Sequence, residues 1–448
     1  FRDARETLAP IGAPGMMGSH PSSRLKVLGV GLFVALLSGC GGFESGSEPG
    51  PLPFGGELQQ VLVDGLEESN GAGVSAAVIV AGYEPWVGAA GFSAISSNGF
   101  VPMRPDMLFQ IASAGKNFAA ALMLQLVEEG RFTLDDPIGR WFSGYDQIDP
   151  EITVRQLLNH TGGIDDWEDN PQSFTGIVVG EGYEAFDWAV WWSMDDVMTL
   201  VGEPDFPRGE SWHYSNTGYY LARRIIETET GMSISQALRT RLLDLLDLNA
   251  MWVECDQPAP HDLDFAPIFW DLNGDLNLDE ISDQPEDFLC SVLSGPIWTT
   301  AEDLARWSQA LFHEGRVLTD ESLVEMLTFV PATTDPTEPM ALAYGLGVGK
   351  FRGTPELERL DHYGHGGNGI GYNALMIYLP EHQASVVALF NENATIDFTA
   401  GPLLEAVDRN LRPAIPMVLL GVAIAVVAVL GFAGWRAWRI RRPSIIDE

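Results

Sequence analysis

The sequence predicts an α+β fold, in which strands from both ends of the chain form one lobe and the middle of the chain is mostly helical. Short apolar or alternating runs bounded by turn residues indicate the strands. Most residues from 113 to 330 have the patterns of helices and loops instead. The expected strands lie near 73–80, 86–93, 344–351, 359–363, 371–379 and 384–391, and helices near 57–68 and 401–411 flank them.

The first helix of the middle region carries a serine and a lysine one turn apart. Residues 114–129 are apolar nearly all round and precede Gly130, which predicts a buried helix with a glycine stop. Ser113 then lies at the helix N-terminus, with Lys116 on the same side. A desolvated lysine loses its preference for the charged form and can accept the serine proton. In the alternative interpretation Ser113 only caps the helix, and Lys116 extends its amine to the surface.

A second segment brings a phenol and a carboxamide together. Tyr214 and Asn216 are two residues apart in an extended or turn segment before the helical run TGYYLARRIIETETG, so both side chains can point the same way. If they converge on Ser113 and Lys116, they can move a proton and orient an acyl amide. An ordinary turn at a helix entry is the alternative.

The third segment, HYGHGGNGIGYNALMIYLP, runs from glycine-rich turn residues into an alternating strand. A strand edge here offers the N–H of Asn368, which together with the N–H of Ser113 would form an oxyanion hole. His365 is otherwise a surface histidine or, with His362, half of a metal pair. An isolated H-x-x-H pair has too few ligands to indicate zinc.

Taken in order, these segments read Ser113-Ala-Gly-Lys116, Tyr214-Ser-Asn216 and His365-Gly-Gly367. They resemble the S-x-x-K, Y-x-N and K/H-x-G motifs of the penicillin-recognising serine hydrolases. The flanks resemble the class C β-lactamase-like branch over about residues 57–410, and that branch includes D,D-carboxypeptidases, D-aminopeptidases, β-lactamases and esterases. The matching flanks are MLFQIASAGKNFAAALMLQLVEEGRFTLDDPIGRWF, ITVRQLLNHTGGI, PRGESWHYSNTGYYLARRIIETETGMS, TTAEDLARWSQAL and YGHGGNGIGYNALMIYLPEH.

The resemblance implies an antiparallel sheet flanked by helices, an inserted, mostly helical lobe at about 130–330, and a site between the lobes. It also implies an acyl-enzyme mechanism without a cofactor, acting on a small molecule or a peptide, such as one derived from the cell wall. The implied roles are nucleophile for Ser113, acid/base pair for Lys116 and Tyr214, amide ligand for Asn216, and substrate-aligning strand for His365 to Gly367 with Asn368.

Two departures from the family pattern narrow the substrate. His365 stands where many such β-lactamases have lysine, and Gly366 lacks the hydroxyl that helps to hold a substrate carboxylate. The chain also has no E-x-x-L-N segment to activate a deacylating water. We therefore expect slow turnover of an ester, an amide or a D-amino-acid peptide rather than efficient hydrolysis of β-lactams. A β-lactamase or D,D-carboxypeptidase and a non-turnover penicillin or peptidoglycan sensor remain the alternatives.

Composition excludes several other classes of protein. The formal net charge is −37 and there is no basic patch outside the ends of the chain, so nucleic acid is not an expected partner. No serine lies in a G-x-S-x-G elbow, and no motif clusters metal ligands as a metallo-hydrolase would require. A length of 448 residues suits one large two-lobed domain, at 57–410, with appendages.

Both ends of the chain have features of membrane attachment. Residues 1–40 read as a leader with a lipoprotein-type signal peptide that ends in a lipobox-like L-S-G-C, which predicts lipid on Cys40 and a flexible linker at 41–56. An uncleaved helical anchor is the alternative for this segment. Residues 414–435 are apolar, uncharged and long enough to cross a bilayer. The arginines that follow predict a cytoplasmic tail at 436–448 and a domain on the extracytoplasmic face of the cell membrane.

Residues 256–289 are expected to form an acidic insertion. Cys255 and Cys290 flank it, and in an exported domain they can form a disulfide. Leu276 occupies the place where an EF-hand needs glycine, and Ser282 replaces the final acid, so a solvated acidic loop is favoured over a calcium site. The calcium-loop candidates in this segment are Asp271, Asn273 and Asp275.

Overall fold

The structure, a computed structural model, describes residues 49–69, 71–96, 99–173, 193–253, 264–270, 279–281, 297–332, 342–351, 361–369, 371–392 and 396–412. Within these ranges no helix combines the length and the apolar character needed to cross a bilayer. Several predicted features lie outside the described residues: the signal peptide with Cys40, the cysteines Cys255 and Cys290, the calcium-loop candidates Asp271, Asn273 and Asp275, and the membrane helix at 414–435.

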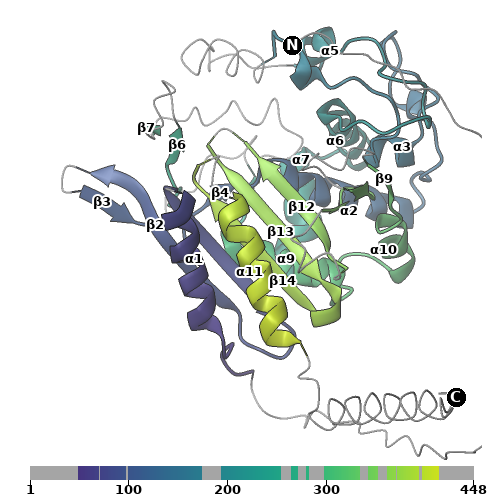
Figure 1. The fold of residues 1–448 in the computed structure, drawn as a ribbon. Helices are drawn as coiled ribbons and strands as arrows, with labels where there is room; N and C mark the ends of the chain where they lie inside the picture. Colours follow the sequence, from purple (N-terminus) through teal and green to yellow (C-terminus); the bar gives the residue numbers. More distant parts are fainter. Residues whose placement is uncertain are drawn as a thin grey trace, which may run out of the picture. The chain divides into compact units, whose positions relative to one another are not determined.

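One antiparallel sheet joins the two ends of the described region. Its strand order is β3-β2-β1-β14-β13-β12-β11-β10-β9, and β1 pairs with β14 so that Val74 lies opposite Phe390. The predicted α+β fold with an antiparallel sheet is therefore confirmed (Figure 1). The strands are β1 (Gly73–Val80), β2 (Trp86–Ser96), β3 (Gly99–Pro102), β9 (Val330–Pro331), β10 (Ala343–Tyr344), β11 (Gly349–Lys350), β12 (Tyr363–Asn368), β13 (Asn373–Leu379) and β14 (Ala384–Phe390).

The structure corrects the prediction for the third motif. His365, Gly366 and Gly367 lie inside β12, as the family resemblance implied, whereas the local pattern predicted a strand near 359–363 followed by glycine-rich turn residues. Each residue of β12 pairs with β13, from Tyr363 opposite Tyr378 to Asn368 opposite Asn373. Neighbouring strands supply the hydrogen bonds and packing that glycine-rich segments lack on their own, so local propensity underestimates such a strand.

Two helices cover one face of the sheet (Figure 1). They are α1 (Gly55–Ser69) and α11 (Ile396–Leu411), which pack on each other and on the sheet. Leu62 of α1 and Leu403 of α11 belong to one apolar cluster with Val386 of β14. At the surface, Glu57 of α1 forms an ion pair with Arg409 of α11. The first and last helices of the described region therefore belong to the same layer.

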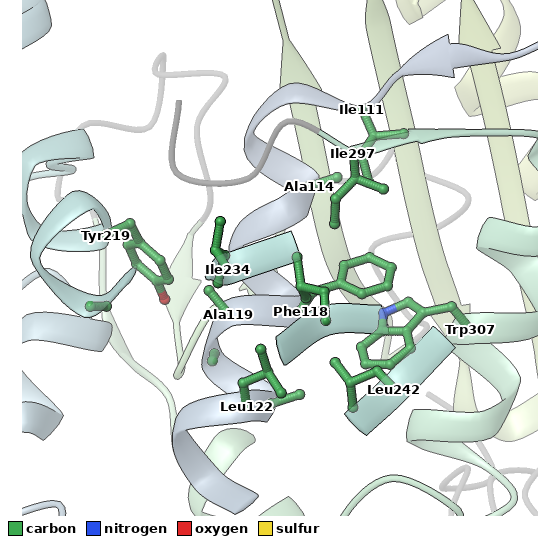
Figure 2. Close-up of a cluster of buried hydrophobic side chains, with 14 of the residues drawn as sticks. Ile111, Ala114, Phe118, Ala119, Leu122, Tyr219, Ile234, Leu242, Ile297 and Trp307 are labelled. Carbon is green, nitrogen blue, oxygen red and sulfur yellow. The ribbon is translucent and has the colours of Figure 1, made fainter. Parts of the chain in front are cut away.

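The opposite face carries α9 (Ala301–Phe312) against the sheet, with α2 (Gly115–Glu128) buried behind it. Figure 2 shows Phe118 of α2 stacked on Trp307 of α9, with ring centroids 3.9 Å apart. Trp307 Nε1 donates to Asn117 Oδ1 at 2.9 Å, and Asn117 Nδ2 donates to the Gly347 carbonyl at 3.0 Å. The predicted buried helix is confirmed, and it is fixed on several sides by apolar and polar contacts.

Helices, turns and short strands make up the remaining described region between β3 and β9. Local capping explains where its helices begin: Thr153 and Gln156 form a capping box at α3, and Ser215 caps α6 through the N–H of Gly218. The sequence missed the short strands because two or three residues carry no detectable alternation. The elements are η1 (Ala112–Ala114), η2 (Ile138–Arg140), α3 (Val154–Leu158), η3 (Trp167–Asp169), α5 (Met194–Leu200), α6 (Asn216–Thr230), α7 (Ile234–Leu238), η5 (Arg239–Leu243), η6 (Asp244–Leu246), α10 (Asp320–Met326), a β4-β8-β5 sheet of Phe109–Gln110, Ile297–Thr299 and Trp252–Val253, and a hairpin of β6 (Ile268–Trp270) and β7 (Asp279–Ile281); η7 (Pro380–His382) lies later, between β13 and β14.

Candidate active site

Ser113 lies in the single turn η1, which leads directly into α2. The residue before it, Ala112, has a φ of +44°, a left-handed conformation that costs a non-glycine residue on the order of 1–3 kcal/mol. Strand β12 lies directly against this turn, because a Cβ on Gly367 would come within 2.0 Å of the Ile111 carbonyl oxygen. The absence of a side chain at Gly367 thus allows the third motif to approach the serine.

Lys116 lies deep inside the site and contacts both Ser113 and the second motif. Its Nζ is 3.0 Å from Ser113 Oγ and 2.6 Å from Asn216 Oδ1. The residue is 1% exposed, which excludes the alternative in which its amine reaches the surface. Burial lowers the pKa of Lys116 to about 8, although the nearby carboxylates of Glu168 and Asp166 oppose that shift. Roughly a tenth of a group with that pKa is uncharged at pH 7.

Tyr214 lies beside both Ser113 and Lys116. Its hydroxyl forms a hydrogen bond with Ser113, and its ring centroid is 4.8 Å from Lys116 Nζ. Removal from water raises the pKa of Tyr214 well above its ordinary value, an effect that the Ser113 hydrogen bond only partly offsets. Tyr214 is therefore protonated at neutral pH, and it is placed to donate rather than to accept.

Asn216 is the first residue of α6, and its amide bridges two charged groups. Its Oδ1 accepts from Lys116, and its Nδ2 donates to Asp166 Oδ2 at 2.9 Å. The structure thus brings the first two predicted motifs together within hydrogen-bonding distance. An ordinary helix-entry turn would not require such contacts with residues distant in the sequence.

His365 projects from β12 and is 4% exposed, so the surface-histidine interpretation is wrong. Its Nδ1 lies against the Gly366 carbonyl, and its Nε2 is 2.7 Å from the Tyr344 hydroxyl. Burial and the charge of Lys116 lower the pKa of His365 to about 3. The ring is therefore neutral, with Nδ1–H donating to the carbonyl and Nε2 accepting from Tyr344.

The remaining predicted residues have simpler surroundings. Asn368 is exposed at the end of β12, opposite Asn373 of β13, and the role of its N–H in an oxyanion hole stays a prediction. Among the described residues no group of three or more potential metal ligands is present, so His365 and His362 gain no further ligands there.

Two buried groups that the three motifs do not name also belong to the site. His160, with a φ of +63°, accepts a hydrogen bond on Nδ1 from the Ser215 N–H at 3.1 Å, and its ring centroid is 4.4 Å from that of Tyr214. Asp166 holds Asn216 as described above. Both residues lie in LLNHTGGIDDW between the first two motifs, where several polar residues occur together and no local signal marks these two as the buried ones.

Residues 58–407 match the sequence profile of the family described as beta-lactamase. Penicillin-binding protein 4* of Bacillus subtilis (strain 168) is 24% identical over 330 residues, which are 69% of this chain and 66% of that protein. Esterase EstB of Burkholderia gladioli is 30% identical over 145 residues, 31% of this chain and 36% of the esterase. The chain therefore spans less than two thirds of the length of either relative.

The fold has also been seen in solved structures. A D-stereospecific amidohydrolase from Streptomyces sp. superposes with a TM-score of 0.66 at 29% identity, over 79% of this chain and 98% of that chain. Together with the sequence matches, this similarity confirms the resemblance that the three motifs and their flanks predicted.

Proposed function

Because the chain belongs to the beta-lactamase family and is a serine hydrolase, we propose that it cleaves an uncharged ester, amide or D-amino-acid peptide through an acyl-enzyme on Ser113. The observation that carries the proposal is the buried contact of 3.0 Å between Lys116 Nζ and Ser113 Oγ. A lysine whose pKa is lowered to about 8 by burial provides a general base next to the nucleophile.

Acylation follows from the protonation states of the site. Uncharged Lys116 takes the hydroxyl proton of Ser113 while Oγ attacks the acyl carbon, and the negative charge develops on the carbonyl oxygen. The N–H groups of Ser113 and Asn368 are proposed to stabilise that oxygen. Tyr214, held protonated by burial, donates its proton to the leaving group as the acyl–leaving-group bond breaks, and it regains a proton from Lys116.

Deacylation repeats these steps with water in place of the leaving group. The water gives a proton to the Tyr214–Lys116 pair, its oxygen attacks the ester carbon, and the Ser113 Oγ leaves and recovers the proton. No cofactor enters either half-reaction, and atoms and charge balance within the pair.

The third motif argues for an uncharged substrate. His365 is neutral because burial lowers its pKa to about 3, and Gly366 has no hydroxyl. Neither residue can therefore attract a substrate carboxylate as a lysine and a threonine would. The Streptomyces amidohydrolase and the Burkholderia esterase favour an amide or an ester, whereas the penicillin-binding relative favours the alternative of a β-lactamase or D,D-carboxypeptidase on cell-wall peptides.

The proposed location is the extracytoplasmic face of the cell membrane, with attachment through a lipid on Cys40 and a membrane helix at 414–435. The lipobox-like L-S-G-C segment and the uncharged apolar run followed by arginines support this proposal.

The nucleophile is tested by labelling with a fluorophosphonate and with a fluorescent penicillin. Wild type should react with the fluorophosphonate and hydrolyse a p-nitrophenyl ester, and Ser113→Ala and Lys116→Ala should lose both reactions. The matched controls Ser69→Ala and Lys350→Ala alter residues of the same types outside the site and should react normally.

Two outcomes decide between the functional classes. The proposed hydrolase activity would be contradicted if wild type reacted with neither probe and hydrolysed no ester in a broad panel. Permanent labelling without turnover would instead favour the alternative from another class, a penicillin or peptidoglycan sensor.

A further inference from the structure

Asp166 is a buried carboxylate that none of the three motifs contains. It is 5% exposed and precedes η3 as its N-cap residue. Its Oδ1 accepts from the Glu168 N–H at 3.1 Å, and its Oδ2 accepts from Asn216 Nδ2 at 2.9 Å. The ion pairs of the described residues include none to Asp166, so its charge is stabilised by these two donors and, across the Asn216 amide, by Lys116.

The segment that carries Asp166 is clamped to the start of α6. Thr217, which follows Asn216, donates its hydroxyl to the Asp165 carbonyl at 2.8 Å and accepts from the Trp167 N–H at 3.0 Å. The residues on both sides of Asp166 are therefore bonded to the residue next to Asn216. These two hydrogen bonds of Thr217 hold the Asp166 carboxylate against the Asn216 amide whether or not a substrate is bound.

The two charged neighbours leave the amide of Asn216 one orientation. A carboxylate only accepts hydrogen bonds and an ammonium group only donates them, so the amide nitrogen must face Asp166 and the oxygen must face Lys116. We propose that Asp166 is a positioning residue, which holds Asn216 with its oxygen on Lys116 and leaves the second hydrogen of its amide nitrogen for the acyl group of the substrate. This inference rests on the proposed serine hydrolase function.

The same arrangement couples Asp166 to the general base electrostatically. The charge of Asp166 raises the pKa of Lys116, against the larger lowering caused by burial, and burial raises the pKa of Asp166 itself to about 6. The loss of this charge should therefore favour uncharged Lys116 at lower pH. The groups that face Lys116 are Ser113 of η1, Tyr214, Asn216 and Tyr219 at the start of α6, Asp166 and Glu168 at η3, His160 after α3 and His365 of β12.

Two substitutions separate orientation from charge. In Asp166→Asn the one remaining oxygen can still accept from Asn216, at the cost of the hydrogen bond from the Glu168 N–H, so the charge is lost and the orientation of the Asn216 amide is kept. In Asp166→Ala both are lost. Asp169→Asn is the matched control, because it removes the same charge from an exposed position of the same short helix.

The measurement is the pH profile of kcat/KM on an uncharged p-nitrophenyl ester, with the fluorophosphonate labelling rate as a second readout and thermal unfolding as a check of folding. We expect Asp166→Ala to lower kcat/KM by about 10- to 100-fold, the range expected for one charge-assisted hydrogen bond. For Asp166→Asn we expect the acidic limb to move below that of wild type, and Asp169→Asn should follow wild type.

Two results together would overturn the positioning role of Asp166 while leaving the serine hydrolase intact. The acidic limb of Asp166→Asn would stay at the wild-type pH, and kcat/KM of Asp166→Ala would equal that of Asp169→Asn. A wild type that reacts with neither ester nor fluorophosphonate overturns the serine hydrolase and this inference with it. If Asp166→Ala fails to fold, Asp166→Asn still decides through its pH profile, which a merely structural role would leave in place.

Discussion

At the scale of single residues, burial shifts the pKa values of the two groups beside Ser113 in opposite directions. It lowers the pKa of the Lys116 amine to about 8 and raises that of the Tyr214 phenol well above its ordinary value. The same loss of water disfavours the charged form of each group, the ammonium in one case and the phenolate in the other. Under this assignment Lys116 is the base and Tyr214 is the acid of the free enzyme.

This assignment predicts how activity depends on pH. Uncharged Lys116 is the active form, so kcat/KM on a neutral ester should rise about tenfold per pH unit below the pKa of about 8 and reach a plateau above it. Initial rates between pH 5 and 9.5, at constant ionic strength, measure the profile.

Lys116→Arg is the control for that profile, because a guanidinium group stays charged across this range. The variant should be inactive at every pH. A wild-type profile that is flat from pH 6 to 9 would contradict the role of Lys116 as the base.

The contacts of individual side chains mark the limit of prediction from sequence. The motif residues Ser113, Lys116 and Tyr214 could be found because their chemistry and order are distinctive. The positions of His160 and Asp166 depend on hydrogen bonds to Ser215 and Asn216, at least fifty positions away in the chain. No local pattern encodes such a pairing, since any polar residue in an apolar segment has many possible partners.

At the scale of elements, the site depends on the approach of β12 to η1. Gly367→Ala would place a Cβ 2.0 Å from the Ile111 carbonyl oxygen, so the strand or the turn must move. We expect this variant to lose activity by at least 10²-fold, because a displacement of about 1 Å in a catalytic group can cost that much. Ester hydrolysis and fluorophosphonate labelling measure the loss.

Gly366→Ala is the matched control for folding, since its Cβ meets only the Ala374 carbonyl oxygen at 3.7 Å, an ordinary contact. Its thermal unfolding temperature should stay close to that of wild type, whereas that of Gly367→Ala should fall. Equal stability and equal activity of Gly367→Ala and wild type would contradict the close packing of strand and turn.

The elements were predicted to different degrees for physical reasons. The buried helix α2 was predicted nearly to its ends, because a long apolar run with a glycine stop specifies it locally. The strand that holds His365 was placed too early, because its glycines gain their extended conformation from pairing with β13. The three-stranded β4-β8-β5 sheet was missed, since each strand is too short to show a period.

At the scale of the whole molecule, the charge of −37 predicts a dependence on salt. A strongly acidic protein repels anionic substrates at low ionic strength, and salt screens that repulsion over a Debye length of about 10 Å at 0.1 M. Acylation by an anionic penicillin should therefore accelerate between 10 mM and 500 mM salt. Hydrolysis of an uncharged ester should change much less, and stopped-flow labelling beside steady-state hydrolysis compares the two. An equal response of both substrates would exclude steering by the net charge.

The two proposed attachments predict where the full chain is found in a bacterial cell. Wild type should sediment with membranes and resist carbonate extraction, because a membrane helix anchors it effectively irreversibly. Cys40→Ser should lose lipid labelling and remain in the membrane through residues 414–435. A chain that carries Cys40→Ser and ends at Arg412 should be released, and its appearance in the membrane pellet would count against both anchors.

The pairing of β1 with β14 and of α1 with α11 also sets the time at which the protein can fold. Glu57 and Arg409, which form an ion pair, are 352 positions apart in the chain. At the usual speed of protein synthesis, roughly 20 to 70 s pass between the emergence of these two residues from the ribosome. Throughout that interval β1 can pair with β2 on one edge, but its other edge has no β14 beside it. We therefore expect the nascent chain to expose this open edge of β1 until its last strand has been made, which favours protection by a chaperone or export before folding.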